Sequence, residues 1–486
     1  MLALTATATP PVLADICRVF DIDADDAVRT GFHRPNLQLL TAVVDAPERD
    51  ARLIETLTRR PASPGIVYVT RQQTAETLSD KLVTAGLPAR AYHAGLDASV
   101  RTEVQEWFLA SPTALVVATI AFGMGIDKAD IRHVYHYNPP KSLENYAQEI
   151  GRAGRDGLPS VCQIFYCSDD LNVLENFVYG DTPDADAVLA LVDSLFSSGE
   201  AFDLALYDTA NRFDIRPLVL RTLLTYLELD GYLAEGTPFY ADYSFQPIVS
   251  SADILARFEG ERRQFLARLL AQASKRRTWF SINLEDSARQ LGCARERIVK
   301  ALDWLGEQQL LKVEVAGVRN CFRRLREPID RAALAAELHK RLLNREGAEL
   351  ARLAQVLALI GSPACRSRQL SAHFGETLSH DCGNCSACLG ETQPLPPRAS
   401  RTIEPELATR LGPLLKSAGK TLGNPRSLTR FLCGCSSPAL TRARLAKHAL
   451  AGVLCDVPFA QVLEWSEALL TGAGHEARAQ LSTESA

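Results

Sequence analysis

The chain has 486 residues, of which 47% are hydrophobic, and this length is enough for about three or four domains with sizeable cores. No apolar run approaches the roughly 18 residues that a membrane-spanning helix needs, so a soluble protein without membrane partners is expected. The net charge of −5 excludes a uniformly basic coat for nucleic acid. The charge is uneven, however, because residues 151–250 have an acidic excess and residues 251–350 a basic one.

Two short apolar segments in the first part of the chain predict buried strands. The first is Gly65–Arg71, which is followed by a helical pattern over Thr74–Val83. The second is Ala91–Leu96, a strand and turn that contains His93. A single histidine of this kind is more often a packed surface residue than a functional one, so His93 by itself predicts no site.

A third strand is predicted further along, and it leads into a glycine-containing loop. Leu115–Thr119 is a short apolar run rich in β-formers, and Ala121–Lys128 contains two glycines and an acid. A parallel strand delivers such a loop to a ligand at its carboxyl end. The loop is therefore a candidate binding element.

Residues 144–157 carry the most chemical information. Arg152 and Arg155 are three residues apart, so both guanidinium groups can lie on one side of a helical turn and reach neighbouring phosphate oxygens. Fixed cations aimed at the γ-phosphate accelerate phosphoryl transfer without covalent chemistry. Gln148 adds an amide for water or phosphate. A solvated helix face is the alternative interpretation of the two arginines.

These segments together resemble superfamily 2 helicases. Residues 144–157 resemble motif VI in the form typical of the RecQ family, and 115–128 resemble motif V. The segments 65–71 and 91–96 resemble motif IV and the neighbouring Tyr-His-Ala-Gly-Leu element. The resemblance implies a RecA-like parallel-sheet domain that couples ATP hydrolysis to 3′-to-5′ DNA strand separation. It assigns these roles: catalysis to Arg152, Arg155 and Gln148, nucleotide contact to Gly125 and Asp127, and DNA contact to Thr119 and His93.

The start of the chain resembles motif III of the same family. Met1–Thr9 reads Met-Leu-Ala-Leu-Thr-Ala-Thr-Ala-Thr, but no G-x-x-x-x-G-K-[ST] and no Asp-Glu-x-His occur in the sequence. We therefore expect Met1 to be an internal methionine of a longer protein, with residues 1–30 a remnant of the first RecA-like domain. A true half-motor is the alternative. ATP and Mg²⁺ would bind through the missing domain, so this chain alone is not expected to hydrolyse ATP.

The middle of the chain predicts winged-helix-like modules. Residues 179–250 read as a helical or winged-helix-like insertion, and 251–328 as a basic winged-helix-like module with a β-hairpin around Ala316–Gly317. The basic cluster Lys275–Arg277 precedes its helices. The second helix of this module carries three cations that are predicted to contact DNA phosphates, Arg295, Arg297 and Lys300. Docking of a protein partner is the alternative for this module.

Four cysteines predict a metal site. Cys382, Cys385 and Cys388 form a C-x2-C-x2-C turn, and Cys365 lies upstream at the end of a predicted helical hairpin over residues 330–362. Four thiolates at this spacing suit a closed, tetrahedral Zn²⁺ site. An iron–sulfur cluster is the chemical rival, and a disulfide pair is less expected in a reducing compartment. The cysteine order and the Phe-Gly-Glu sequence at residues 374–376 resemble the RecQ zinc subdomain.

The predicted fold class is α/β. It comprises a RecA-like domain, winged-helix-like modules, a helical zinc-binding subdomain and a small α-helical C-terminal domain. The remaining predicted bounds are 31–178 for the second RecA-like domain, 329–392 for the helical hairpin and zinc-binding subdomain, 393–400 for a linker, 401–475 for the small helical domain and 476–486 for a disordered tail.

The sequence thus predicts the C-terminal portion of a RecQ-like, ATP-dependent DNA helicase of recombination and repair. It would act on single strands and duplex junctions, with a single-strand-binding protein or repair proteins as further partners. The expected location is cytoplasmic, of the bacterial type and associated with the nucleoid. A non-motor zinc-containing DNA-binding protein and a winged-helix scaffold that binds proteins are the alternatives.

Overall fold

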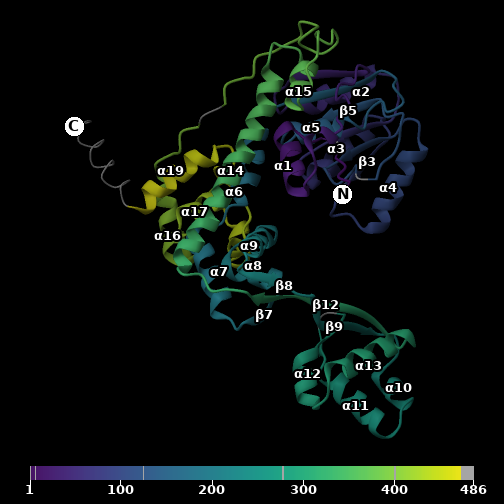
Figure 1. Cartoon of the computed structure of the whole chain (residues 1–486), viewed down its shortest axis with the longest axis vertical. Helices are drawn as coiled ribbons and strands as arrows, with labels where there is room; N and C mark the ends of the chain where they lie inside the picture. The colour runs from purple at the N-terminus through teal and green to yellow at the C-terminus, as the bar shows by residue number, and fades with distance from the viewer. Residues whose placement is uncertain (1, 6, 124, 276–277, 399–400, 472–486) are drawn as a thin grey trace, which may run out of the picture. The chain divides into compact units, whose positions relative to one another are not determined.

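The structure is a computed structural model, and it describes residues 2–5, 7–123, 125–275, 278–398 and 401–471 (Figure 1). The chain divides into two compact units, which are described separately below. The first unit comprises Met1–Gly180, Leu343–Cys435 and Ala449–Ala486, and the second comprises Asp181–Leu342 and Ser436–His448. The predicted disordered tail, 476–486, and part of the basic cluster at 275–277 lie outside the described residues.

The first unit is built on a parallel six-stranded sheet, as predicted. The strand order is β1-β6-β5-β2-β4-β3, and every neighbouring pair is parallel. The strands are β1 (Leu37–Val43), β2 (Gly65–Tyr68), β3 (Ala89–Tyr92), β4 (Leu115–Ala118), β5 (His133–His136) and β6 (Ser160–Tyr166). All residues of β2, β4 and β5 are buried, because helices cover both faces of the sheet.

Alternate residues of each central strand enter different cores. In β2, Ile66 packs into one cluster with α4 and α5, whereas Val67 packs into another with α2 and α3. The helices of this part are α1 (Pro10–Phe20), the 3₁₀ turn η1 (Ala24–Asp26), α2 (Arg49–Arg59), α3 (Gln72–Thr84), α4 (Ala98–Ala110), α5 (Leu143–Ile150) and α6 (Asp170–Gly180). This is the doubly wound arrangement of a RecA-like domain, so the predicted α/β class is confirmed.

The buried residue His133 of β5 is expected to make the free energy of unfolding sensitive to acid. Burial, followed by the charges of Arg60 and Arg132, lowers the pKa of His133 from 6.5 to about 4. The unfolded chain therefore binds a proton that the folded chain excludes as the pH falls below 6.5, so stability is lost between pH 6.5 and 4. We expect His133→Asn to reduce the loss of unfolding free energy between pH 7 and pH 5 by about 2 kcal/mol. Urea denaturation of the wild-type protein and the variant at pH 7 and pH 5 tests this. An equal loss of unfolding free energy in the two proteins would contradict it.

The first unit also contains the zinc-binding segment and most of the C-terminal helices. The elements are α15 (Arg366–His373), α16 (Glu406–Leu422), α17 (Pro425–Leu432) and α19 (Phe459–Leu470). Residues 393–398 of the predicted linker contact this unit, because Arg398 pairs with Glu175 at 2.7 Å and Gln393 accepts a hydrogen bond from Val43 N, while residues 399–400 lie outside the described residues. Among the described helices, none is long and apolar enough to cross a membrane.

The helical hairpin predicted over 330–362 is wrong. Residues Arg331–Gly361 form one helix, α14, which has residues in both units. The interior Gly347 was the only available break, and a single glycine costs a helix only about 1 kcal/mol. That cost is too small to end a helix whose apolar residues are buried over its length, such as Leu338 and Val356.

The second unit contains two cores joined by one long strand. Its elements are α7 (Ala185–Ser197), β7 (Ala201–Leu204), α8 (Leu206–Phe213), α9 (Pro217–Leu229), β8 (Leu233–Glu235), β9 (Phe239–Pro247), α10 (Ser251–Ala256), α11 (Gly260–Ala271), β10 (Ser274–Lys275), β11 (Phe280–Asn283), α12 (Leu284–Leu291), α13 (Arg295–Glu307), β12 (Leu311–Arg324), α18 (Pro438–Arg442) and η2 (Leu445–Lys447). Helices α7–α9 build one core, and α10–α13 build the other.

The β-hairpin predicted around Ala316–Gly317 is also wrong. Strand β12 continues through these residues, and its first part pairs with β9 while its last residues pair with β7 and β8. The partner of β12 is thus supplied from upstream of the module, so the chain does not turn back on itself. Gly317 has φ +63°, and a Cβ there would lie 2.6 Å from the Asp242 carboxylate. Residues 239–319, which contain the core built by α10–α13, are therefore inserted between β8 and the last residues of β12, which belong to the core built by α7–α9.

Candidate nucleotide and zinc sites

Two predicted DNA-binding residues lie at neighbouring strand ends of the parallel sheet. Thr119 follows β4, and its backbone N–H donates to the carbonyl of Tyr92, the last residue of β3, at 3.2 Å. His93 follows Tyr92, but its side chain is only 3% exposed and its Nε2 lies 3.1 Å from Glu76 Oε1. The structure therefore leaves Thr119 partly accessible, whereas it buries His93 in a contact with α3.

Arg152 joins the two predicted motif loops. It lies in the turn after α5, and its guanidinium donates to the carbonyl of Gly123 in the loop after β4. Gly123 has φ +148°, and a Cβ there would lie 2.3 Å from the guanidinium, so only glycine fits. Arg152 is 9% exposed, so its main role in the described structure is to connect the turn after α5 to the loop after β4.

Arg155 is more exposed than Arg152, although the sequence predicted the same catalytic role for both. Its side chain is 39% exposed and pairs with Asp127 at 2.8 Å, and Asp127 itself is largely exposed. Gly125 is also exposed and has φ +80°. The structure thus brings Arg155, Asp127 and the loop of Gly125 together. Of the two arginines, Arg155 has the side chain that can leave its partner and reach a phosphate.

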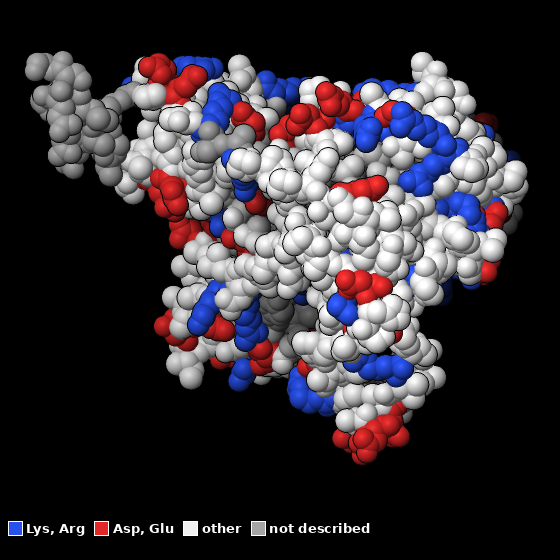
Figure 2. Space-filling model, turned by 90° about the horizontal axis from the view of Figure 1, so that it is seen from above, with Lys and Arg blue, Asp and Glu red and all other residues white. Residues whose placement is uncertain are grey.

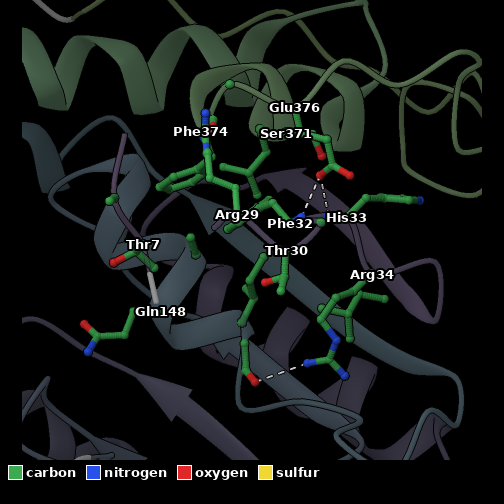
Figure 3. A pocket seen from close by; sticks show the side chains of 18 of the residues that line it. Thr7, Arg29, Thr30, Phe32, His33, Arg34, Gln148, Ser371, Phe374 and Glu376 are labelled. Carbon is green, nitrogen blue, oxygen red and sulfur yellow. Dashed lines mark hydrogen bonds between the residues drawn. The ribbon is translucent and has the colours of Figure 1, made fainter. Parts of the chain in front are cut away.

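A cavity of about 740 Å³ lies beside this turn (Figure 3). All three predicted catalytic residues, Gln148, Arg152 and Arg155, line it. Its wall also includes residues that were not predicted as site residues, namely Arg29, Phe32, His33, Arg34 and Ser371. Thr7 lies in the segment that resembles motif III, and Phe374 and Glu376 belong to the Phe-Gly-Glu sequence of the zinc subdomain resemblance. Neither resemblance assigned these residues to a cavity, and nothing in the sequence showed that Arg29–Arg34 would lie beside residues so far along the chain.

The four predicted metal ligands come together. The Sγ atoms of Cys365, Cys382, Cys385 and Cys388 all lie within 4.8 Å of one another. Cys365 precedes α15, and Gly383, with φ +74°, allows the tight turn between the other ligands. Four thiolates at these separations fit a tetrahedral Zn²⁺ site.

The surroundings favour the thiolate form of Cys385, whereas burial raises the pKa of Cys365 and of Cys388. Burial would raise the pKa of Cys385, but N–H groups of Cys388 and Arg366 and the neighbouring thiols lower it to about 6. The Arg366 N–H lies 3.4 Å from Cys385 Sγ, and the Cys382 N–H lies 3.3 Å from Cys365 Sγ. His373 Nε2 lies 2.7 Å from Glu144 Oε1 and is not among the residues that cluster with the four cysteines.

The basic helix α13 offers fewer free cations than predicted. Arg295 donates to the Tyr240 carbonyl at 2.6 Å and lies over the Phe239 ring. Arg297 pairs with Glu261 at 2.8 Å. Lys300 is exposed and makes no ion pair with the residues that the structure describes. On the face of the protein seen in Figure 2, basic and acidic side chains are intermixed, without a broad region of one sign.

These contacts sharpen the prediction for DNA binding by α13. We expect Lys300→Ala to reduce the log–log salt slope of duplex binding by about 0.9, the value for one lost phosphate contact. Adding Arg297→Ala is expected to lower the slope by up to about 0.9 more, because its ion pair with Glu261 is exposed and a DNA phosphate can replace it. Adding Arg295→Ala is expected to change the slope little, because Arg295 donates to the Tyr240 carbonyl and lies over the Phe239 ring. Titrations at several salt concentrations measure this. An unchanged affinity and slope in the triple variant would mean that α13 faces solvent or a protein partner.

Comparisons with known proteins agree with the two sites. Residues 48–157 match the helicase conserved C-terminal domain, and residues 322–389 match the RecQ zinc-binding domain. The second match contains all four cysteines, which identifies the centre as a zinc site.

Three relatives illustrate the range of similarity. The chain is 27% identical over 485 residues to ATP-dependent DNA helicase Q-like 5 of Arabidopsis thaliana, covering 96% of this chain and 52% of that protein. It is 43% identical over 173 residues to ATP-dependent DNA helicase RecQ of Bacillus subtilis, covering 36% and 29%. It is 39% identical over 179 residues to a putative ATP-dependent RNA helicase of Acanthamoeba polyphaga mimivirus, covering 37% and 32%.

The chain thus spans about half of the first relative and about a third of the others. The matched regions contain the helicase loops and the zinc cysteines whose geometry is described above. The chain therefore contains a segment that matches the helicase conserved C-terminal domain and a segment that matches the RecQ zinc-binding domain, and it is similar to RecQ helicases in these regions.

Proposed function

We propose that the chain works within an ATP-dependent DNA helicase that moves 3′ to 5′ along one strand and separates duplexes. The observation that carries this proposal is the arrangement at the turn after α5. Arg152 joins this turn to the loop after β4, while Arg155 stays accessible beside the cavity. This arrangement can couple a nucleotide at the turn to a strand bound at Thr119, because Arg152 connects the turn to the loop that follows the carboxyl end of β4 and begins at Thr119.

The nucleotide is proposed to bind between this RecA-like domain and another one. No phosphate-loop sequence occurs in the 486 residues, so the β- and γ-phosphates and Mg²⁺ would be held by the other domain. Arg155 would leave Asp127 and approach the γ-phosphate, where it stabilises the charge of the transition state. Gln148, which is exposed on the cavity wall, would hold water or a phosphate oxygen.

Strand-displacement assays test the proposal. The complete motor, meaning this chain together with a RecA-like domain that carries the phosphate loop, is offered 3′-tailed and 5′-tailed duplexes of DNA and of RNA. The expected result is ATP-dependent opening of the 3′-tailed DNA duplex, with little opening of the 5′-tailed one. The 486-residue chain alone is expected to hydrolyse no ATP. DNA binding without DNA-stimulated hydrolysis in the complete motor would instead favour a non-motor DNA-binding protein.

A further inference from the structure

We propose that the segment Arg29–Asn36, here called the strap, couples the zinc-binding domain to the turn that carries Arg152 and Arg155. When the zinc-binding domain is folded, the strap holds the backbone of this turn in place. Arg34 and Glu376 are then positioning residues for catalysis, although neither was predicted to be a site residue. The inference rests on the proposed helicase function for its catalytic consequence. Its structural part stands on contacts within the first unit alone.

The zinc-binding domain holds one end of the strap. Glu376 Oε2 accepts hydrogen bonds from the backbone N–H groups of Phe32 and His33, both at 2.7 Å (Figure 3). The Phe32 ring stacks on Phe374 with centroids 4.2 Å apart, and Arg29 donates to the Phe374 carbonyl. A carboxylate that accepts two N–H groups forms charge-assisted bonds, which are about twice as strong as neutral ones. The strap is therefore fixed to the residues that follow α15.

The other end of the strap holds the arginine turn. Arg34 donates to the carbonyl of Gly151 at 3.2 Å and to the carbonyl of Gly154. These carbonyls belong to the peptide groups that lead directly into Arg152 and Arg155. One guanidinium thus fixes the backbone immediately before both arginines. Its planar fork suits this geometry, which a lysine ammonium cannot reproduce.

The fit between strap and turn is close. Asn36 Nδ2 donates to the Gly154 carbonyl at 2.8 Å and to the Leu158 carbonyl at 3.0 Å. Gly154 has φ +53°, and a Cβ there would lie 2.5 Å from Asn36 Nδ2 and from Ser160 Oγ. A side chain at Gly154 would displace Asn36 of the strap, so the two segments are expected to move together.

The zinc centre itself holds the two segments that flank the strap, namely α15 with the residues that follow it, and β1. Cys365 precedes α15, which leads to Phe374 and Glu376. On the other side, Ser386, between two zinc ligands, donates its N–H to the Leu39 carbonyl and accepts the Thr41 N–H on β1, the strand after the strap. Loss of zinc would therefore release the strap from both directions.

A second contact between the zinc-binding domain and α5 is less able to fix the arginines. His373 contacts Glu144 at 2.7 Å, but Glu144 lies in the first turn of α5, whereas the arginine turn follows its last residue. This contact sets the start of the helix. The strap is the connection that reaches the turn itself.

Hydrogen exchange of the zinc-loaded 486-residue chain tests the structural part. We expect Arg34→Ala and Glu376→Ala to raise amide exchange in residues 151–157 by about tenfold or more, because local opening of the turn costs less without the strap. Zinc content and protection of β2 and β4 should stay unchanged. Arg34→Lys should give an intermediate increase. The control Glu391→Ala, an exposed glutamate of the same domain, should leave the turn unchanged.

Removal of zinc with a chelator then tests whether the strap couples the zinc-binding domain to the turn. In the wild-type chain it should raise exchange in residues 151–157, and in Arg34→Ala it should add little, because two changes on one connection are not additive. An equal further increase in Arg34→Ala would overturn the proposal. So would unchanged exchange of the turn in both Arg34→Ala and Glu376→Ala, a result that does not depend on the zinc-free chain remaining folded.

The catalytic consequence is measured separately in the complete motor. Arg34→Ala should lower kcat for ATP by about tenfold or more while KM changes much less, because it misplaces groups that act in the transition state. Arg34→Lys should restore part of kcat. A normal kcat in Arg34→Ala would remove its positioning role. If the wild-type motor hydrolyses no ATP while the exchange results hold, the helicase proposal fails and the strap connection stands.

Discussion

Replacement of Arg155 by alanine is expected to lower ATP turnover of the complete motor by about 10³-fold or more, with the Kd for ATP changed much less. The reason is that Arg155 is the accessible arginine beside the cavity, whereas Arg152 is held against Gly123. Steady-state kinetics and an ATP-binding titration measure the two effects. Arg155→Lys should recover little, because a lysine lacks the planar fork.

The ion pair between Arg155 and Asp127 does not oppose this role. Both side chains are substantially exposed, so the pair is worth only about 0–1 kcal/mol and a γ-phosphate can replace it. The matched control is Arg59→Ala, an exposed arginine on α2 that pairs with Glu55. Turnover in Arg59→Ala should stay near the wild-type value. A comparable loss in that variant would refute the assignment of Arg155.

Replacement of Cys385 by serine is expected to abolish zinc binding, where the wild-type chain holds one zinc ion. Cys385 is fully buried and belongs to the same apolar cluster as Leu370 and Phe374. A structural zinc contributes folding free energy directly, about 10–16 kcal/mol in small zinc-finger peptides, so its loss should unfold α15 and the turn that follows. Elemental analysis measures the metal, and limited proteolysis near residue 365 reports the unfolding.

The control for the zinc prediction is Cys455→Ser, an exposed cysteine outside the cluster. This variant should keep its zinc and its resistance to protease. A folded, reduced wild-type sample without zinc would contradict the prediction. Stoichiometric iron with visible absorption would favour the rival iron–sulfur cluster.

Features defined by short-range spacing could be predicted from the sequence. Strand β4, which precedes the loop Ala121–Lys128, is apolar at every residue because both faces of the sheet are covered, and this pattern is visible in Leu115–Ala118 without a structure. The zinc cysteines were predictable for a similar reason. Three of them share one turn, and tetrahedral coordination restricts their spacing to a few residues.

Errors in the predicted secondary structure arose where a distant segment decides the local conformation. The stretch around Ala316–Gly317 has the composition of a hairpin, but β9 provides its partner and keeps β12 extended. Helix α14 continues through Gly347 because buried side chains on both sides outweigh one weak residue. Local propensities differ by only about 1 kcal/mol, so tertiary packing overrides them.

The sequence by itself determined the parallel-sheet class, the two motif loops and the zinc ligands, because each depends on residues close together in the chain. Only the tertiary structure separated the roles of Arg152 and Arg155 and revealed Arg34 and Glu376 beside them. Those roles depend on the hydrogen bonds that the Phe32 and His33 N–H groups donate to Glu376, and on those that Arg34 donates to the turn. The donors and acceptors are common polar groups separated by long stretches of sequence, and only the folded backbone brings them within 3 Å or so of one another.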